Sequence, residues 1–154
     1  MTETLDRADL KILRALQRDG RVPTVALAES VGLSPTATTE RMKRLSREGY
    51  IKSYAALLNP SLLNLGLLVY VEVTLDKTTP DVFARFAQTA RSSPEILECH
   101  LVAGGFDYLI KVRVRDMEAY RVLLTQTILT FPGVKESRTY VVMEEVKAEL
   151  HLPI

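Results

Sequence analysis

The first third of the chain carries apolar residues at the spacing of short amphipathic helices. Between Asp6 and Gly20 they recur every three to four positions, which predicts a helix capped by the Asp6 side chain. Gly20 is expected to end this helix in the left-handed conformation. A second, short helix is predicted over 25–31, with Thr24 as its start signal and Gly32 as its stop.

A third helix has the clearest signals of all. Ser34 can cap it, and Pro35 suits its first position because proline has no N–H to leave unpaired there. Gly49 can end it after residues 36–48. Only Gly32-Leu33-Ser34 joins the second helix to the third, and this spacing predicts a helix-turn-helix.

The two sides of the third helix differ in chemistry. Thr38, Met42 and Leu45 project to one side at ~100° per residue, which leaves a polar, basic side that could enter a major groove. Its threonines, Glu40 and Lys43 could meet base edges, and its arginines could reach phosphates. An ordinary solvated helix face is the alternative interpretation. The candidate DNA-contacting residues are Ser34, Thr36, Thr39, Glu40, Arg41, Lys43, Arg44 and Arg47.

From residue 50 onward the pattern changes to that of β-strands. Residues 50–58 predict a strand that ends at the turn signal Asn59-Pro60. Two strand–helix–strand units follow, with apolar residues at alternate strand positions. Their strands are expected at 67–75, 96–102, 108–114 and 138–146, and their helices start at Thr79 and Asp116 and end near Ser93 and Thr130.

Two such units form βαββαβ, which predicts a ferredoxin-like antiparallel sheet with both helices on one face. Tyr70, Leu109, Tyr140 and Val142 would lie on the other face, and a second subunit is the expected cover. The fold class is therefore α+β. The expected domains are a helix-turn-helix (winged) domain at 1–53, a strand and linker at 54–66, and a ferredoxin-like domain at 67–154.

Charge divides the chain at the same place. The net charge of the 154 residues is only +1, which by itself argues against nucleic-acid binding. Residues 1–53, however, hold ten Lys and Arg against seven Asp and Glu, a balance of +3, and the remainder is at −2. This asymmetry indicates two modules with different partners.

The rest of the composition bears on the compartment. Cys99 is the only cysteine, so no intramolecular disulfide can form and a reducing compartment is expected. The longest apolar run, 65–71, is far shorter than the ~20 residues of a membrane span. The N-terminal sequence lacks a signal-peptide pattern. A cytoplasmic location without membrane partners is therefore expected.

Catalytic and metal-binding patterns are weak. Glu98-Cys99-His100 contains metal-ligand types, but neighbours on a strand point to opposite faces, which separates Cys99 from the other two. Gly104-Gly105 lacks the spacing and the following helix of a nucleotide-binding loop. No acid–base or nucleophile constellation stands out, so neither an enzyme nor a metal site is expected.

Several stretches carry a family pattern. They are Val31-Gly32-Leu33-Ser34-Pro35-Thr36, Glu40-Arg41-Met42-Lys43-Arg44-Leu45, Leu57-Leu58-Asn59-Pro60, and residues 98–102 and 139–147. Together they resemble the Lrp/AsnC family of feast/famine transcription regulators over nearly the whole chain. The resemblance implies a sequence-specific regulator that binds double-stranded DNA, dimerises through its sheets, assembles further into octamers and responds to a free amino acid. Residues 37–39 depart from the family pattern, which leaves the operator sequence open.

The resemblance also implies an effector site near residues 103–107, where Gly104 and Asp107 fit the family's Gly-x-x-Asp pattern. Asp107 could accept from the ammonium of an amino acid, and the N–H groups of the glycine turn could donate to its carboxylate. A plain hairpin turn with Asp107 as local acceptor is the alternative. Leucine is the first candidate effector, with proline or others as alternatives. The candidate effector-binding residues are Leu101, Gly104, Gly105, Asp107, Met117, Tyr140 and Val142.

Two other functions remain open. An amino-acid-binding module that acts on a metabolic enzyme without binding DNA predicts that Lys43→Glu and Arg44→Glu leave function intact. A small ferredoxin-like enzyme predicts turnover of acyl-phosphate or similar substrates.

Overall fold

The computed structural model describes residues 5–154 and divides into two compact units. The helical unit runs to Leu57 and also holds Lys147–Ile154, and the sheet unit spans Leu58–Val146. Residues 1–4, which belong to the predicted domain at 1–53 and to the N-terminal sequence considered for a signal peptide, lie outside the described residues. Among residues 5–154, no helix has the length and apolar character needed to cross a membrane.

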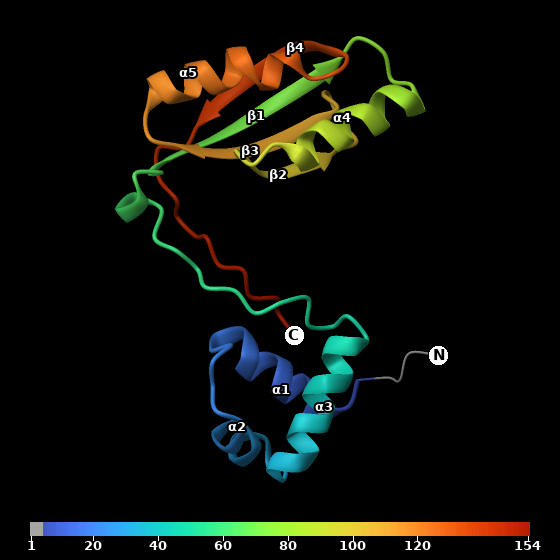
Figure 1. Cartoon of the computed structure of the whole chain (residues 1–154), viewed down its shortest axis with the longest axis vertical. Helices are drawn as coiled ribbons and strands as arrows, with labels where there is room; N and C mark the ends of the chain where they lie inside the picture. Colours follow the sequence, from blue (N-terminus) through green and yellow to red (C-terminus); the bar gives the residue numbers. More distant parts are fainter. Residues whose placement is uncertain (1–4) are drawn as a thin grey trace. The chain divides into compact units, whose positions relative to one another are not determined.

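The helical unit contains α1 (Arg7–Arg18), α2 (Thr24–Val31) and α3 (Pro35–Arg47), close to the predicted bounds (Figure 1). Asp6 caps α1 by accepting from the backbone N–H of Asp9, and Ser34 caps α3 by accepting from that of Ala37. Gly32 is left-handed after α2, as predicted. Ile12, Leu27 and Leu45, one from each helix, are fully buried and form the centre of its core.

Gly20 does not adopt the predicted conformation. α1 ends at Arg18, its C-cap Asp19 is extended, and Gly20 does not have a positive φ angle. A Cβ atom at Gly20 would lie 3.2 Å from Cδ1 of Tyr54. This glycine therefore makes room for an aromatic ring from a distant segment, a role that local sequence does not reveal.

The strand predicted over 50–58 is not formed. Residues 52–58 have no regular secondary structure, and their side chains are exposed. These residues favour extended backbone, but a strand also needs a neighbour for its N–H and C=O groups. The described part of a single chain supplies no such neighbour at this place, so the prediction was wrong for the isolated chain.

The sheet unit has the predicted βαββαβ order, and its four strands form an antiparallel sheet in the order β2-β3-β1-β4. Short 3-10 turns lie at Ser61–Leu63 (η1) and Ile128–Thr130 (η2). The strands and helices are β1 (Leu67–Leu75), α4 (Pro80–Ser92), β2 (Ile96–Leu101), β3 (Tyr108–Val114), α5 (Met117–Gln126) and β4 (Val134–Val141).

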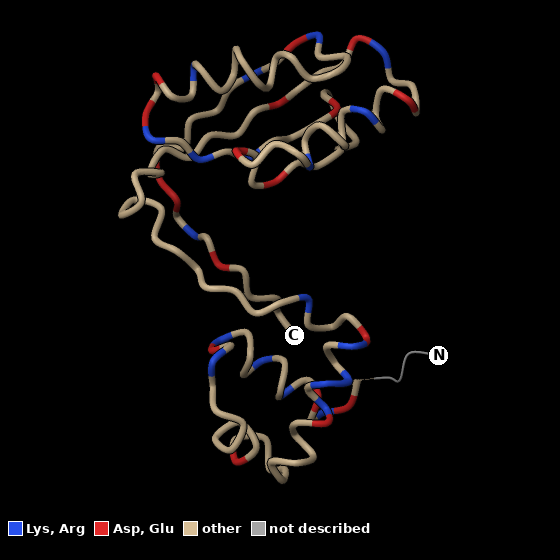
Figure 2. Tube along the Cα trace, viewed as in Figure 1, with Lys and Arg blue, Asp and Glu red and all other residues tan. Residues whose placement is uncertain are grey.

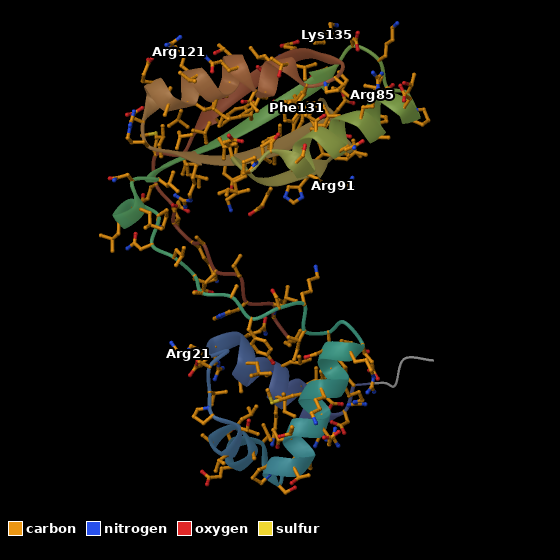
Figure 3. All side chains as sticks on the ribbon, viewed as in Figure 1. Arg21, Arg85, Arg91, Arg121, Phe131 and Lys135 are labelled. Atoms are coloured by element: carbon orange, nitrogen blue, oxygen red, sulfur yellow. The ribbon has the colours of Figure 1, made fainter. Side chains whose placement is uncertain are left out.

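Helices α4 and α5 cover the same face of this sheet (Figure 1). Alternate residues of β1, such as Val71, are buried there against Phe86 of α4 and Leu123 of α5. Phe131 packs into the same core, with its ring centroid 5.3 Å from that of Phe86, whereas Arg121 on α5 points away from the sheet (Figure 3). Burial of this apolar face is the main source of the unit's stability.

The opposite face of the sheet carries three of the four residues predicted for it, whereas Val142 lies just beyond the end of β4. Tyr70 and Tyr140 are paired across β1 and β4, and Leu109 of β3 lies opposite Glu72 on the same face. Neither α4 nor α5 covers this open face, and Tyr140 is 47% exposed.

Two predicted ends in the sheet unit were wrong. The helix expected to reach Thr130 stops at Gln126 and is followed by η2. The last strand runs over Val134–Val141 rather than 138–146. It can start early because Gly133, left-handed at φ +77°, completes the preceding turn. It ends at Val141 opposite Val69, and among residues 5–154 only one further hydrogen bond, from the Val142 N–H to the Leu68 carbonyl, continues the pairing.

The last eight residues pack on the helical unit, which the predicted domain at 67–154 did not anticipate. The side-chain amide of Gln17 accepts from the N–H of Leu152 at 2.6 Å and donates to the carbonyl of the same residue at 3.3 Å. Arg14 of α1 donates to the Ile154 carbonyl at 2.5 Å. The end of the described chain is thus attached to its first helix.

Candidate functional site

Helix α3 presents a polar side to solvent, as its sequence predicts. Thr38 and Leu45 are fully buried against the other helices. Thr36, Glu40, Lys43 and Arg47 are exposed, and Lys43 and Glu40 form an ion pair at 2.9 Å in which each side chain is 66% exposed. Exposed pairs of this kind contribute little stability, so both charges remain available to another partner.

Hydroxyl groups at the start of α3 are already engaged. Ser34 Oγ accepts from the N–H of Ala37 at 3.2 Å, and the Thr39 hydroxyl donates to the Pro35 carbonyl at 2.9 Å. Thr36 is exposed beside them. Ser34 therefore orients the first turn of the helix, while the side chain of Thr36 faces solvent.

Arg41 and Arg44 are placed differently from the other bases of α3. Arg41 Nη1 lies 2.8 Å from Asp9 Oδ1 and 2.7 Å from Asp6 Oδ2, and Arg44 Nη2 lies 2.6 Å from Asp9 Oδ2. The Asp9 side chain is only 1% exposed, against 18% for Arg44 and 30% for Arg41. Both arginines thus join α3 to α1 within the helical unit, where acidic and basic positions of the chain trace lie close together (Figure 2).

The electrostatics of Asp9 reflect these partners. Burial raises the pKa of its carboxyl, but hydrogen bonds from Arg44, the Asp6 backbone and Arg41 outweigh burial and lower the pKa from 3.8 to about 2. Asp9 is absent from the candidate residues that the sequence suggested. Its position three residues after the cap Asp6, with Ile12 three residues further on, is a signal that would have placed it at the start of the buried side.

Asp107 has a structural partner in the sheet unit. Its Oδ2 accepts from the N–H of Leu75 at 2.7 Å, and its own N–H donates to the Val73 carbonyl at 3.0 Å. The carboxylate is half-buried, and its second oxygen has no hydrogen-bond partner among residues 5–154. Asp107 therefore holds the end of β1 and can still offer one oxygen to a ligand.

Gly104 and Gly105 form the exposed tip of the loop between β2 and β3. A Cβ atom at either would meet nothing within 4 Å, so the fold of the single chain does not require glycine there. Beside this loop, on the open face, lies a polar cavity of about 140 Å³ that sequence reasoning missed. Its lining residues are Glu72, Thr74, Gly105, Phe106, Glu136, Ser137 and Arg138.

A single chain does not bring all seven candidate effector residues together. Asp107 bonds to Leu75 at one end of β1, whereas the Val142 N–H bonds to the Leu68 carbonyl at the other. Seven residues of strand correspond to about 20 Å. Met117 follows β3 at the same end as Val142, and Tyr140 lies between the two ends. The expectation of one pocket holding all of them is therefore not met within one chain.

Leu101 faces a separate, larger cavity of about 630 Å³ between α4 and β2. This cavity also includes Phe83, Ala87, Arg91 and Tyr108. Leu101 is 60% exposed at its rim. Leu101, which was predicted for the apolar wall of the effector site, thus lines a different cavity from Gly105.

Glu98, Cys99 and His100 follow the predicted alternation. His100 Nε2 lies 3.2 Å from Glu98 Oε2, and Lys111 Nζ lies 2.7 Å from Glu98 Oε1. Cys99 packs on the opposite side against the core, where burial raises the pKa of its thiol. Among residues 5–154, no group of three or more His, Cys, Asp or Glu side chains could hold a metal ion.

Comparison with known families assigns a type to each unit. Residues 5–52 match the model of a winged helix-turn-helix DNA-binding domain, and residues 68–152 match that of the Lrp/AsnC ligand binding domain. The chain is 56% identical to the leucine-responsive regulatory proteins of Klebsiella pneumoniae and of Escherichia coli K12 over 97% of its own length and 92% of theirs.

Solved structures agree over both units. A transcriptional regulator from Neisseria meningitidis, determined as a complex with L-Met, superposes with a TM-score of 0.92 at 39% identity and covers 97% of each chain. An AsnC family regulator from Agrobacterium tumefaciens superposes with the same TM-score at 32% identity and the same coverage.

Proposed function

Because this chain belongs to the Lrp/AsnC family of transcription regulators, we propose that the exposed side of α3 reads double-stranded DNA while the sheet unit senses a free amino acid. The chain is a DNA-binding transcriptional regulator. The observation that carries the assignment of the DNA-reading surface is the exposed polar side of α3, with Thr36, Glu40, Lys43 and Arg47 on the second helix of a helix-turn-helix.

Within that surface we assign different roles to different residues. Thr36, Glu40 and Lys43 would meet base edges, and Arg47 would meet phosphate. Ser34 and Thr39 would act through the first turns of the helix that they hydrogen-bond. Contacts from Arg41 and Arg44 to phosphate would first require these arginines to leave Asp9.

The DNA-binding role can be tested by fluorescence anisotropy with a labelled promoter duplex at several salt concentrations. Lys43→Gln should weaken binding about tenfold, since a charge-assisted contact is lost. Lys77→Gln removes the same charge from an exposed site in the sheet unit and should bind like the parent. Absence of salt-sensitive binding by the parent would contradict the proposed function.

For the effector we propose an apolar amino acid, with leucine first. Two observations support this proposal. The relatives from Klebsiella pneumoniae and Escherichia coli K12 are named leucine-responsive regulatory proteins, and the regulator from Neisseria meningitidis was determined as a complex with L-Met. Asp107 would accept from the ammonium with its second carboxylate oxygen, and the exposed N–H groups of Gly104 and Gly105 would donate to the carboxylate. Because the candidate residues lie at two ends of the sheet, a complete pocket would take residues from more than one chain.

Asp107→Asn separates the two roles of this side chain. The asparagine keeps an oxygen for the Leu75 N–H but removes the negative charge needed for the ammonium. The leucine concentration that produces half of the change in DNA affinity should rise at least about tenfold, with thermal stability nearly unchanged. Asp81→Asn, an exposed acid on α4, is the control. Equal leucine responses in Asp107→Asn and the parent would remove Asp107 from the site.

The other two candidate functions receive less support. The matched regions and named relatives are those of transcription regulators, which disfavours both a DNA-independent metabolic module and an enzyme. We therefore propose that the chain has no catalytic activity, which a screen for turnover of acyl-phosphate substrates would check. A cytoplasmic location follows from the proposed access to chromosomal DNA.

A further inference from the structure

Five basic residues lie on α3 or shortly after it, but the structure divides them into two groups. Lys43, Arg47 and Lys52 are exposed. Arg41 and Arg44 are bound to the acids Asp6 and Asp9 of α1. This acid–base cluster of two acids and two bases, called here the Asp9 clamp, is neutral overall.

Asp9 is the centre of the clamp. Its two carboxylate oxygens receive Arg41 Nη1 at 2.8 Å and Arg44 Nη2 at 2.6 Å, and Oδ2 also accepts the Asp6 N–H at 3.1 Å. Since the side chain is 1% exposed, removing an arginine from it would leave a buried charge with too few partners. The two arginines are therefore held far more strongly than Lys43 is held by exposed Glu40.

Positive charge on a DNA-binding surface lowers its preference for one sequence over another. Each base that reaches a phosphate adds affinity for any duplex, and steepens the dependence of log affinity on log salt by about 0.9. Base contacts alone distinguish one sequence from another. A DNA-binding unit in which two arginines are kept away from the phosphates thus binds random DNA less tightly and depends more on its base contacts.

We infer that Asp9 is a specificity-determining residue, which retains Arg41 and Arg44 inside the helical unit so that they do not bind phosphates indiscriminately. The inference rests on the proposed DNA-reading role of α3. The clamp also joins α3 to the first turn of α1, so the same contacts set the orientation of the recognition helix within its unit.

The test uses the full chain and two labelled duplexes, one selected from a random pool by the parent and one of random sequence and equal length. Asp9→Asn removes the buried charge that binds both arginines and keeps the size of the side chain, while Asp6 remains a partner of Arg41. Its affinity for the random duplex should rise, its salt slope should steepen by up to about 2, and its preference for the selected duplex should fall at least about tenfold.

Matched variants identify the source of any change. Asp19→Asn removes one exposed acid from the same unit without touching the clamp, so it controls for net charge. Asp9→Asn combined with Arg41→Gln and Arg44→Gln should return the salt slope to that of the parent. Asp6→Asn preserves a helix cap and weakens only the binding of Arg41, which keeps Asp9 as a partner, so it should give a smaller change in the same direction even if Asp9→Asn folds poorly.

The outcomes distinguish a failure of the proposed function from a failure of the inference. If the parent shows no preference for its selected duplex, the proposed function fails and the inference fails with it. If the parent discriminates but Asp9→Asn and Asp6→Asn match Asp19→Asn in slope and preference, only the inference is overturned. A lost preference with an unchanged slope would show damage to helix packing rather than release of arginines, and would overturn it as well.

Discussion

At the scale of single residues, the helical unit depends on one buried carboxylate. Asp9 takes part in the capping box that starts α1 and also receives both arginines from α3. Its pKa of about 2 is lower than the ordinary 3.8 because hydrogen bonds to the charged form outweigh the effect of burial. A proton therefore binds the unfolded chain more readily than the folded one at this site.

Acid should remove this contribution. It is present in full above the unfolded pKa of 3.8 and is lost as the pH falls toward the folded pKa of about 2. The difference corresponds to about 2 kcal/mol of unfolding free energy. Asp9→Asn should be less stable at neutral pH and should show a flatter acid dependence. Urea unfolding at a series of pH values would measure the unfolding free energy of each protein. Amide exchange of α1 and α3 would locate the loss of stability in the helical unit.

The control for the acid experiment is Asp19→Asn, whose site is exposed in the same unit. It should retain the acid dependence of the parent. If the unfolding free energy falls equally with pH in the parent and in Asp9→Asn, Asp9 is not the group responsible for the loss of stability in acid.

At the scale of helices and strands, glycines at the ends of elements differ in what they tolerate. Gly32 ends α2 at φ +74°, and a Cβ atom there would meet nothing within 4 Å, so only its backbone conformation is demanding. Gly133 precedes β4 at φ +77°, and a Cβ there would lie 2.6 Å from Val82 Cγ1 on α4. The turn before β4 therefore combines a left-handed conformation with close packing.

Alanine at the two glycines should give different losses. Gly32→Ala should lower the unfolding free energy of the helical unit by about 1 kcal/mol, the cost of a left-handed alanine. Gly133→Ala should cost the sheet unit at least about twice as much, since overpacking adds to the backbone strain. Chemical denaturation of both variants measures the two losses. Equal losses of unfolding free energy would show that the Val82 side chain can move aside without an energetic cost.

At the scale of the whole molecule, the open face of the sheet has aromatic and charged side chains but no covering helix among residues 5–154. Tyr70 and Tyr140 are paired there, and Arg113 binds Glu145 at 2.6 Å. A two-layer unit normally buries the second face of its sheet against something. We propose a second subunit as the cover, with further assembly into octamers.

Self-association can be measured by light scattering. The parent should form particles at least twice the 17.3 kDa of one chain at micromolar concentration. Tyr140→Arg should shift the particles toward the monomer, because it adds charge to the proposed interface. Leu129→Arg changes a residue of similar exposure in η2 and should not. A monomeric parent would refute the proposed dimer.

The end of the described chain provides a further test at this scale, because Leu152 depends on Gln17 for both its backbone hydrogen bonds to α1. Gln17→Ala should speed amide exchange of Leu152 about fivefold, the effect of losing about 1 kcal/mol. Gln88→Ala on α4 is the matched control. Unchanged exchange at Leu152 would show that the amide pair does not hold this segment.

The amino-acid sequence was sufficient for features that depend on neighbours along the chain. The Ser34 cap, the left-handed Gly32 and the two sides of α3 followed from residue types at fixed spacing. Alternating apolar positions located the strands and the face that α4 and α5 cover, because burial favours a single periodicity in each kind of element. The order of elements then left βαββαβ as the natural arrangement.

Contacts between distant segments had to come from the folded chain. Periodicity does not state which carboxylate an arginine will meet: the sequence pattern directs Arg41 and Arg44 to phosphates, whereas the folded chain pairs both with Asp9. Nor does β propensity provide a partner strand, which is why 50–58 is irregular among the described residues. Ion pairs, strand ends and chain attachments depend on what lies nearby in space, and only folding determines that.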